Sequence, residues 1–294
     1  MINKLKELNI GEVKENEDLK KYNTYNVSVK AAAVVFVSNA KALIKLLKFL
    51  KYEKIKYKVI GNGSNLIFVN DYDGILIKLN NLDKLIINEE EVIVESGYNL
   101  SKLSLIAADK GLSGLEFSVG IPGSIGGAVY MNAGAYNKSM SDIIEYIEVI
   151  DENYKIKKLK NKDLNFDYRN SILKEKNCIC IKVVLKLEKS NKKEIKELML
   201  DRQKRRKETQ PLEYPNAGSV FRNPKDLYAG KLIEDLNLKG YHINDAFISE
   251  KHANFIINKG NASGKDIENL IKYIQKEVYS KYKINLILEQ EIVK

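Results

Sequence analysis

The segment Gly111–Tyr136, GLSGLEFSVGIPGSIGGAVYMNAGAY, holds seven of the 17 glycines in this 294-residue chain and a single charged residue. Glycine costs backbone entropy and adds no side-chain packing, so this density predicts a backbone that comes close to a ligand. Successive backbone N–H groups in tight turns bind anions, and we expect a phosphate-bearing cofactor here. The alternative interpretation is a plain glycine-rich turn or a site of close helix packing.

A second glycine turn, Gly61–Asn65 or GNGSN, lies between two short apolar runs of strand character, residues 57–60 and 66–69. The dinucleotide fingerprint GxGxxG needs a third glycine that opens a helix, but this position is Leu66 and the chain re-enters a strand. A Walker A loop is also missing from the sequence. The remaining hypothesis is that the two glycine turns hold one diphosphate from both sides. The alternative for GNGSN alone is a plain Asn-Gly hairpin turn.

The composition limits the classes of protein to which the chain can belong. A formal net charge of +10 is compatible with nucleic-acid binding, but the cations are mostly scattered lysines, which is typical of a solvated surface. No stretch reaches the roughly 18 apolar residues of a membrane helix, and the N-terminus lacks a signal-peptide core. We therefore expect a cytoplasmic protein without nucleic-acid or membrane partners. Cys178 and Cys180 are poorly spaced for zinc or a disulfide, and we expect buried free thiols.

Arginine is rare in this lysine-rich chain, and its positions are informative. The five arginines are Arg169, Arg202, Arg205, Arg206 and Arg222. Where lysine serves as the general cation, an arginine indicates a need for a planar, bidentate donor to carboxylate or phosphate. The alternative for the three central arginines is a solvent-facing helix, whereas Arg169 and Arg222 lie outside that helix and favour a functional role.

The hydrophobic pattern predicts a mixed α+β chain. A strand over residues 31–37, a helix over 40–52 capped by Ser38, and a strand over 56–60 form an opening βαβ unit with a parallel pair. Further strands are predicted over residues 75–79, 91–95, 143–150, 179–187, 246–249 and 255–258. Further helices are predicted over residues 100–110, 191–207, 229–236 and 264–282, the second of which bridges to a second unit.

Three polar segments differ from ordinary surface: DYRNS (Asp167–Ser171), YPNAGSVFRNP (Tyr214–Pro224) and LILEQEI (Leu286–Ile292). Together they supply a cation, a hydroxyl on a tight Ala-Gly-Ser turn, and a carboxyl. Glu289 and Glu291 share one face of a predicted strand, so spacing alone does not choose between them. The two histidines, His242 and His252, lack the partner spacing of a metal site or catalytic triad. We interpret both as structural or supporting residues and predict no metal site.

In chain order, these motifs resemble the UDP-N-acetylenolpyruvoylglucosamine reductase family, also called UDP-N-acetylmuramate dehydrogenase. The motifs are GNGSNLIF, GIPGSIGGAVYMNAGAY, YRNS, YPNAGSVFRNP, AGKLIEDLNLKG, ISEKHANFIIN and LEQEI. They extend over about residues 22–292 and resemble the shorter form of the family. The resemblance implies an α+β fold with a vanillyl-alcohol-oxidase/p-cresol-methylhydroxylase-type FAD-binding domain of two lobes over residues 1–195. A smaller α+β substrate-binding domain over residues 196–294 follows, and its final strand returns to the active site.

The resemblance also implies an activity: an NADPH-dependent flavin oxidoreductase with non-covalent FAD. Such an enzyme reduces UDP-N-acetylglucosamine enolpyruvate to UDP-N-acetylmuramate for peptidoglycan synthesis, and so serves cell-wall biogenesis, cell shape and cell division. Its partner is a small-molecule UDP-sugar, and we expect a monomer. One alternative is another FAD-dependent oxidoreductase of the same fold acting on an alcohol or sugar. A non-catalytic nucleotide-binding module is a further alternative, but neither explains the three polar segments.

Residue roles follow from the same resemblance. Arg169 is expected to stabilise negative charge at C2 of the enolpyruvyl group, Glu291 to be the carboxyl that partners Arg169, and Ser219 to donate a proton at C2. Tyr168 and Asn223 match substrate-contacting positions. The implied cofactor-binding residues are Gly61, Asn62, Gly63, Ser64, Asn65, Leu66, Gly120, Ile121, Pro122, Gly123, Ser124, Gly126, Gly127, Ala128, Asn132 and Gly134. The chain departs from its relatives at residues 24–29, where a glycine pair is replaced and we assign no FAD contact, and at residues 242–246.

Overall fold

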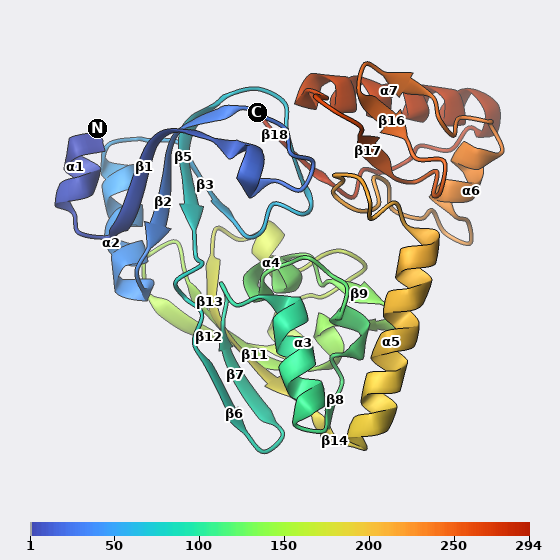
Figure 1. Ribbon diagram of the computed structural model, residues 1–294. Helices are drawn as coiled ribbons and strands as arrows, with labels where there is room; N and C mark the ends of the chain where they lie inside the picture. The colour runs from blue at the N-terminus through green and yellow to red at the C-terminus, as the bar shows by residue number, and fades with distance from the viewer. Residues whose placement is uncertain (1) are drawn as a thin grey trace. The chain divides into compact units, whose positions relative to one another are not determined.

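The computed structural model describes residues 2–294, which form two compact units (Figure 1). The first unit contains the chain up to Glu15, residues 33–62 and residues 74–204. The second unit contains residues 16–32, 63–73 and 205–294. Neither unit is a continuous segment, because residues 16–32 and 63–73 belong to the same unit as the C-terminal part of the chain.

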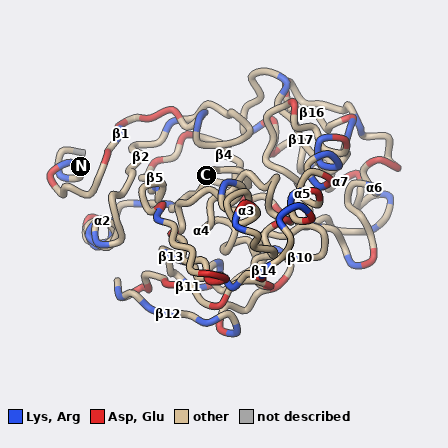
Figure 2. The backbone as a smooth tube through the Cα atoms, turned by 60° about the horizontal axis from the view of Figure 1, so that its bottom comes forward, with Lys and Arg blue, Asp and Glu red and all other residues tan. Residues whose placement is uncertain are grey.

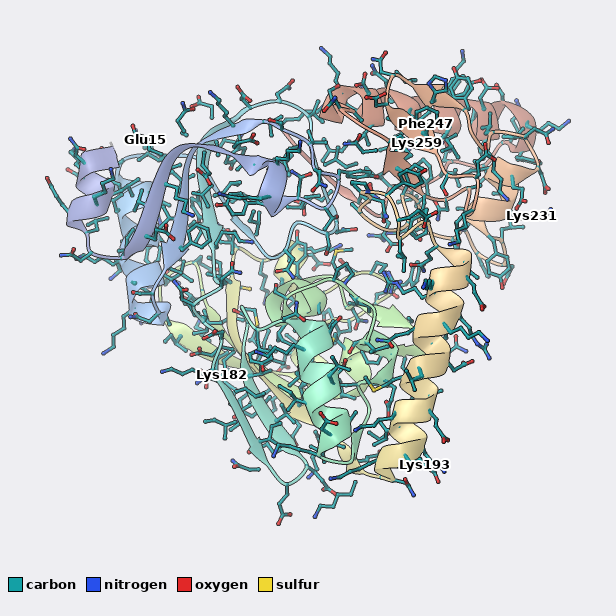
Figure 3. All side chains as sticks on the ribbon, in the orientation of Figure 1. Glu15, Lys182, Lys193, Lys231, Phe247 and Lys259 are labelled. Atoms are coloured by element: carbon teal, nitrogen blue, oxygen red, sulfur yellow. The ribbon has the colours of Figure 1, made fainter. Side chains whose placement is uncertain are left out.

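A five-stranded antiparallel sheet of order β12-β11-β13-β7-β6 forms one part of the first unit. Its strands are β6 (Leu85–Asn88), β7 (Glu91–Glu95), β11 (Ile144–Ile150), β12 (Ile156–Lys160) and β13 (Ile179–Lys186). Apolar side chains from β7, β11 and β13 pack in one core with α3 (Leu100–Asp109) and α4 (Ile125–Tyr130). On the sheet, Lys182 of β13 is paired in register with Glu148 of β11, and their charged groups lie 2.8 Å apart (Figure 3).

A second sheet of order β1-β2-β5-β3 is built from β1 (Gly11–Asp18), β2 (Lys30–Val37), β3 (Tyr57–Ile60) and β5 (Tyr72–Lys78). Helix α2 (Ala40–Tyr52) places Leu43, Leu46 and Leu50 at helical spacing into the core formed with these strands. The predicted parallel pair of residues 31–37 and 56–60 does not form, because β5 lies between β2 and β3 in the sheet; β3 pairs in parallel with β5 instead. Helix α2 has the predicted bounds, but Asn39 is its N-cap instead of Ser38, because its Oδ1 accepts from the Ala42 N–H at 2.9 Å.

The second unit is centred on α7 (Gly264–Tyr282), whose bounds match the prediction. Its buried residues Ile267, Ile271, Ile274 and Val278 pack against α6 (Ala229–Glu234) and the strands of this unit. Those strands are β15 (His242–Ile243), β16 (Ala246–Ile248), β17 (Ile256–Asn258), β4 (Leu66–Phe68) and β18 (Glu291–Val293). β4 and β18 pair in parallel, with Glu291 opposite Leu66, so only the end of the tail predicted as strand-like is a strand.

Helix α5 (Lys192–Thr209) contains the point, between residues 204 and 205, at which the chain passes from the first unit to the second. Lysine and arginine are spread along the backbone, as Figure 2 shows. Within residues 2–294, no helix combines the length and apolarity that crossing a membrane requires. Cys180 is buried as a free thiol, as expected, whereas the free thiol of Cys178 is only partly buried, because Cys178 lies at the edge of β13.

Candidate active site

The turn Gly61–Asn65 follows β3. Within the first unit, its residues Gly61 and Asn62 lie against the glycine-rich segment Gly111–Tyr136. A Cβ atom added at Gly61 would lie 2.5 Å from the Ser124 Oγ, so a larger residue would displace that hydroxyl from its place at the start of α4. The Asn62 side-chain amide donates to the carbonyl of Pro122 at 3.4 Å. Behind the turn, the buried Lys78 ammonium donates a hydrogen bond to the Gly61 carbonyl. The turn is therefore fixed from both sides by residues of the same unit.

The glycine-rich segment Gly111–Tyr136 is also constrained, by backbone hydrogen bonds and close packing. The N–H groups of Ile125 and Gly126 donate to the carbonyls of Tyr98 and Ser96, at 2.9 and 2.8 Å. A Cβ at Gly126 would lie 2.9 Å from the Cβ of Ser96. The Ser96 hydroxyl below it is buried and lacks a hydrogen-bond partner within the described residues. Close backbone approach and an unpaired buried hydroxyl fit a site for the phosphate-bearing cofactor FAD.

Two of the predicted cofactor residues have structural explanations of their own. Asn132, at φ 41°, donates from its amide to the Asp167 carbonyl at 3.1 Å and accepts from the Ser141 N–H at 3.0 Å. Gly134 lies in β9 (Gly134–Ala135), where a Cβ would lie 2.5 Å from the carbonyl oxygen of Lys138. The side chain of Asn132 therefore joins the end of α4 to the segment that carries Arg169.

Arg169 lies in a tight turn in which Asp167 and Asn170 exchange backbone hydrogen bonds of 3.2 and 3.1 Å. Its φ of 55° is in the left-handed region, which is uncommon for a long side chain. The guanidinium carbon lies 5.1 Å from the ring centre of the half-exposed Tyr168. Fourteen other non-glycine residues in the described part of the chain also have a positive φ, Lys54 and Lys283 among them, so this conformation defines the turn and does not mark it as functional.

In the second unit, the end of the GNGSN turn contacts the C-terminal segment. The Gly63 carbonyl accepts from the Thr24 N–H at 3.4 Å, and a Cβ at Gly63, φ 68°, would overlap the Tyr22 carbonyl. The Asn65 amide donates to the Glu289 carbonyl at 3.1 Å, and the Glu291 N–H donates to the Asn65 carbonyl at 2.9 Å. The structure thus brings together the predicted residues Asn65 and Glu291.

Ser219 follows Gly218, which has a φ of 78° and donates from its N–H to the Asn216 Oδ1 at 3.0 Å. Gln290, between the two glutamates, holds this turn: its amide nitrogen donates to the carbonyls of Ala217 and Gly218 at 3.1 and 3.0 Å. Its Oε1 accepts from the buried Tyr25 hydroxyl at 3.0 Å. Gln290 was not among the predicted site residues. Alternation along a strand places its side chain on the face opposite to Glu289 and Glu291.

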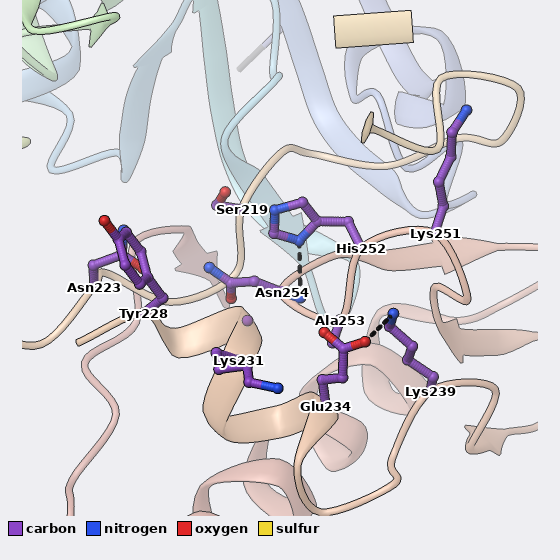
Figure 4. A pocket seen from close by; sticks show the side chains of 11 residues that line it. Ser219, Asn223, Tyr228, Lys231, Glu234, Lys239, Lys251, His252, Ala253 and Asn254 are labelled. Atoms are coloured by element: carbon purple, nitrogen blue, oxygen red, sulfur yellow. Dashed lines mark hydrogen bonds and ion pairs between the residues drawn. The ribbon is translucent and has the colours of Figure 1, made fainter. Parts of the chain in front are cut away.

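A pocket of about 320 Å³ opens beside Ser219 within the second unit (Figure 4). It is lined by Ser219, Asn223, Tyr228, Gly230, Lys231, Glu234, Lys239, Lys251, His252, Ala253 and Asn254. Three lysines and one glutamate leave a positive balance at neutral pH, which favours an anionic ligand. The Oδ1 of Asn223 accepts from the Ala229 N–H at 3.1 Å, which turns the amide donors to the other side. The pocket therefore joins two predicted residues, Ser219 and Asn223, to cations that the sequence analysis did not select.

The two histidines differ in their environments. His242 is exposed and stacks on Phe247 at 4.3 Å, and the Lys259 ammonium lies 4.3 Å from the centre of the Phe247 ring (Figure 3). His252 lines the pocket, and burial together with the positive charge of Lys239 lowers its pKa, against an opposing effect of Glu234. His242 fits the predicted structural role, whereas His252 is a candidate site residue.

Comparison with known proteins assigns the family. The chain is 44% identical over 295 residues to UDP-N-acetylenolpyruvoylglucosamine reductase from Caldanaerobacter subterraneus, covering 100% of this chain and 98% of that protein. The chain belongs to the UDP-N-acetylenolpyruvoylglucosamine reductase family. The reductase of the same name from Bacillus subtilis is 42% identical over 296 residues, with coverage of 100% and 98%. Residues 31–160 match the family model of an FAD binding domain, and residues 210–293 match the C-terminal domain model of this reductase family.

Solved structures agree with this assignment. The crystal structure of UDP-N-acetylenolpyruvylglucosamine reductase from Thermus caldophilus matches with a TM-score of 0.82 and 34% identity, covering 96% of this chain and 98% of that one. The BBE-like 1 protein of Physcomitrella patens matches with a TM-score of 0.50 and 14% identity, covering 64% and 44%. That second likeness concerns the fold alone. The predicted α+β fold with a vanillyl-alcohol-oxidase-type FAD-binding domain is confirmed.

Proposed function

We propose that this protein reduces UDP-N-acetylglucosamine enolpyruvate to UDP-N-acetylmuramate, with NADPH as the reductant and FAD as the cofactor, in cytoplasmic peptidoglycan precursor synthesis. The observation that carries the proposal is the cationic pocket that contains Ser219 and Asn223 in a member of this reductase family. In this proposal the second unit binds the UDP-sugar, and the glycine turns of residues 61–66 and 120–127 hold the FAD diphosphate. When bound, FAD supplies the hydride that is delivered to C3 of the enolpyruvyl group.

Ser219 then donates its proton to C2. The Oγ–H bond breaks, a C–H bond forms at C2, and the serine oxygen is left as an alkoxide that regains a proton from water. A serine is a very weak acid, so the transfer needs a strongly basic acceptor and a rigidly held hydroxyl. Hydrogen bonds supply that rigidity. The Gln290 amide holds the carbonyls of Ala217 and Gly218, and Asn216 Oδ1 holds the Gly218 N–H, so the backbone before Ser219 is fixed.

Arg169 stabilises the negative charge that develops at C2 and in its carboxylate, and Glu291 is the carboxyl that partners Arg169. A guanidinium is a permanent cation with paired donors that match a carboxylate, so it stabilises the electron-rich state more than the ground state. Glu291 lies in β18, where its N–H is held by Asn65.

The pocket lysines provide a site for the substrate's diphosphate. Lys239 is 2.6 Å from Glu234, and Lys231 is 2.7 Å from Asp235, a carboxylate outside the pocket lining. These exposed pairs are worth little in water, so a diphosphate can exchange with the carboxylates at small cost. The Asn223 amide adds a neutral donor to the same wall.

The test is an anaerobic absorbance measurement on the FAD-loaded protein, with NADPH added first and the enolpyruvyl ether second. We expect the flavin band to be lost with NADPH and to return with the UDP-sugar. Ser219→Ala should leave the first phase unchanged and slow the second by roughly 10²- to 10⁴-fold, the usual contribution of a proton-transfer group. Ser280→Ala on the exposed face of α7 is the matched control. A flavin band that does not respond to the UDP-sugar in the unmodified protein would overturn the proposal.

A further inference from the structure

His252 lies in the tight turn between β16 and β17, and the turn holds it firmly. The N–H groups of Lys251 and His252 donate to the Ser249 Oγ at 3.1 and 3.4 Å. The His252 carbonyl accepts from the Phe255 N–H at 2.9 Å, and the imidazole ring lies 4.8 Å from the Phe255 ring. Both the backbone and the ring of His252 are therefore fixed before any ligand binds.

The hydrogen bonds of the ring define its tautomer. His252 Nδ1 accepts from the Asn254 N–H at 3.2 Å, so the proton of the neutral imidazole is on Nε2. Figure 4 shows the Nε2 edge of the ring directed toward Ser219, which lines the same pocket. A neutral N–H donor therefore faces the side of the pocket that holds the proposed proton donor.

The two residues are also anchored to one another through the backbone. Ser219 and Phe255 form an antiparallel bridge, and the Asn254 carbonyl accepts from the Val220 N–H at 2.9 Å. The Asn254 side chain exchanges two hydrogen bonds with the backbone of Phe221, at 3.0 and 2.8 Å. The distance between Ser219 and His252 is thus set by a short, fully hydrogen-bonded connection.

The charges around His252 favour its neutral form. Burial is the main cause of its lowered pKa, a contact of the ring with the His252 backbone opposes it, and the positive charge of Lys239 lowers the pKa further. Lys231 and Lys251 also line the pocket, and Glu234 is the carboxylate there that opposes them. A protonated imidazole would moreover place a proton on Nδ1 against the Asn254 N–H.

We propose that His252 is a positioning residue for Ser219: with substrate bound, its Nε2–H donates a hydrogen bond to the Ser219 oxygen, orients the hydroxyl proton toward C2 and stabilises the alkoxide that remains. This inference rests on the proposed function. Within residues 2–294 no direct hydrogen bond joins the two side chains before substrate binds, and catalytic hydrogen bonds commonly shorten only in the complex. His252 itself transfers no proton, because its donor proton stays on Nε2 and water restores the serine.

The first test does not depend on turnover. The chain has two histidines, so ¹⁵N-detected NMR of the FAD-loaded protein resolves both rings, with His242→Gln identifying each signal. We expect His252 to be the Nε2–H tautomer and to remain neutral down to a pH below the ordinary histidine pKa. A cationic His252 at pH 7, or an Nδ1–H tautomer, would overturn the inference whatever the activity of the protein.

The second test separates the two phases of the reaction. His252→Phe should leave the loss of flavin absorbance with NADPH unchanged and slow its return with the UDP-sugar by about 10- to 100-fold, as for a hydrogen bond to a charged group. The Michaelis constant for the UDP-sugar should change little, because the bond strengthens only as the alkoxide forms. His252→Gln, which retains an N–H donor, should recover part of the rate, and His242→Gln is the matched control.

The pH profile gives a readout that a merely structural role would not change. Protonation leaves the Nε2–H donor in place but puts a second proton on Nδ1, which breaks the Asn254 hydrogen bond that orients the ring. In the unmodified protein the rate of the second phase should therefore fall as pH falls through the His252 pKa, and His252→Phe should lose that dependence. If the unmodified protein shows no return of absorbance with the UDP-sugar, the proposed function fails, and the NMR result still stands on its own. If the unmodified protein responds and His252→Phe matches it at every pH, the inference about His252 fails alone.

Discussion

Lys78 provides the most quantitative test of the energetics around the turn Gly61–Asn65. Its side chain, on β5, is 4% exposed and donates a hydrogen bond to the Gly61 carbonyl. Burial lowers its pKa from 10.5 to about 8. Replacing it by methionine keeps the length of the side chain and removes the charge, so Lys78→Met isolates the cost of burying an ammonium group.

The magnitude and its sign follow from that shift. At about 1.4 kcal/mol for each pH unit, the gap between 10.5 and about 8 corresponds to roughly 3 kcal/mol. Between these two pH values the unfolded chain holds the Lys78 proton and the folded chain does not, so stability rises as pH rises. Below about pH 8 the folded protein carries the whole penalty, and above about 10.5 it carries none.

Urea unfolding between pH 7 and pH 10.5 measures this effect. The free energy of unfolding of Lys78→Met, minus that of the unmodified protein, should fall by roughly 3 kcal/mol across the range. A constant loss of about 1–3 kcal/mol from the unpaired Gly61 carbonyl leaves this slope unchanged. Lys41→Met, on the exposed face of α2, is the control and should show no such slope. Parallel curves for Lys78→Met and the unmodified protein would refute the reasoning.

Two further changes test the glycine turns and the thiols. Gly61→Ala, whose Cβ would lie 2.5 Å from the Ser124 Oγ, should reduce the flavin bound per protein after purification, whereas Lys41→Ala on the exposed face of α2 should not. Equal flavin content in the two variants would contradict the close-approach argument. Burial raises the pKa of the Cys180 thiol to about 12. In the variant Cys178→Ser, a reagent that reacts with thiolates should therefore label Cys180 at pH 8 only after the protein is unfolded. Rapid labelling of the folded variant would show that Cys180 is accessible.

Local patterns in the sequence predicted the elements that pack through one face. Helix α7 was predicted with its bounds because Ile267, Ile271 and Val278 keep helical spacing. The structure adds a capping box between Ser263 and Asp266 at its start. β12 was missed, because its sequence IKKLK is largely exposed and its pairing with β11 leaves no apolar alternation. The discontinuous second unit was also missed, since hydrogen bonds between distant segments have no local signal in the sequence.

In the candidate site, too, features with a local pattern were predicted and features that depend on distant contacts were not. The glycine turns could be found because several glycines must coincide in a short stretch of chain, which composition alone detects. Gln290 could not, because it acts as a single residue whose partners, such as the Gly218 carbonyl, are backbone groups of another segment. His252 was interpreted only as a structural or supporting residue, because its contact with the Asn254 N–H has no signal in the sequence. Alternation within LEQEI could have indicated that Gln290 faces inward, but not what it holds.

The pairing of β4 with β18 has a consequence for synthesis of the protein. Asn65 and Glu289, which the pairing brings into contact, are 224 residues apart in the chain. At the usual translation rate of 5–20 residues per second, the segment after Gly63 waits roughly 10 to 45 seconds for its partner to emerge. During that interval the apolar residues Leu66–Phe68 have an unpaired edge, on which another nascent chain could dock. Removing β18 would make that exposure permanent, so its earliest effect should be aggregation during expression.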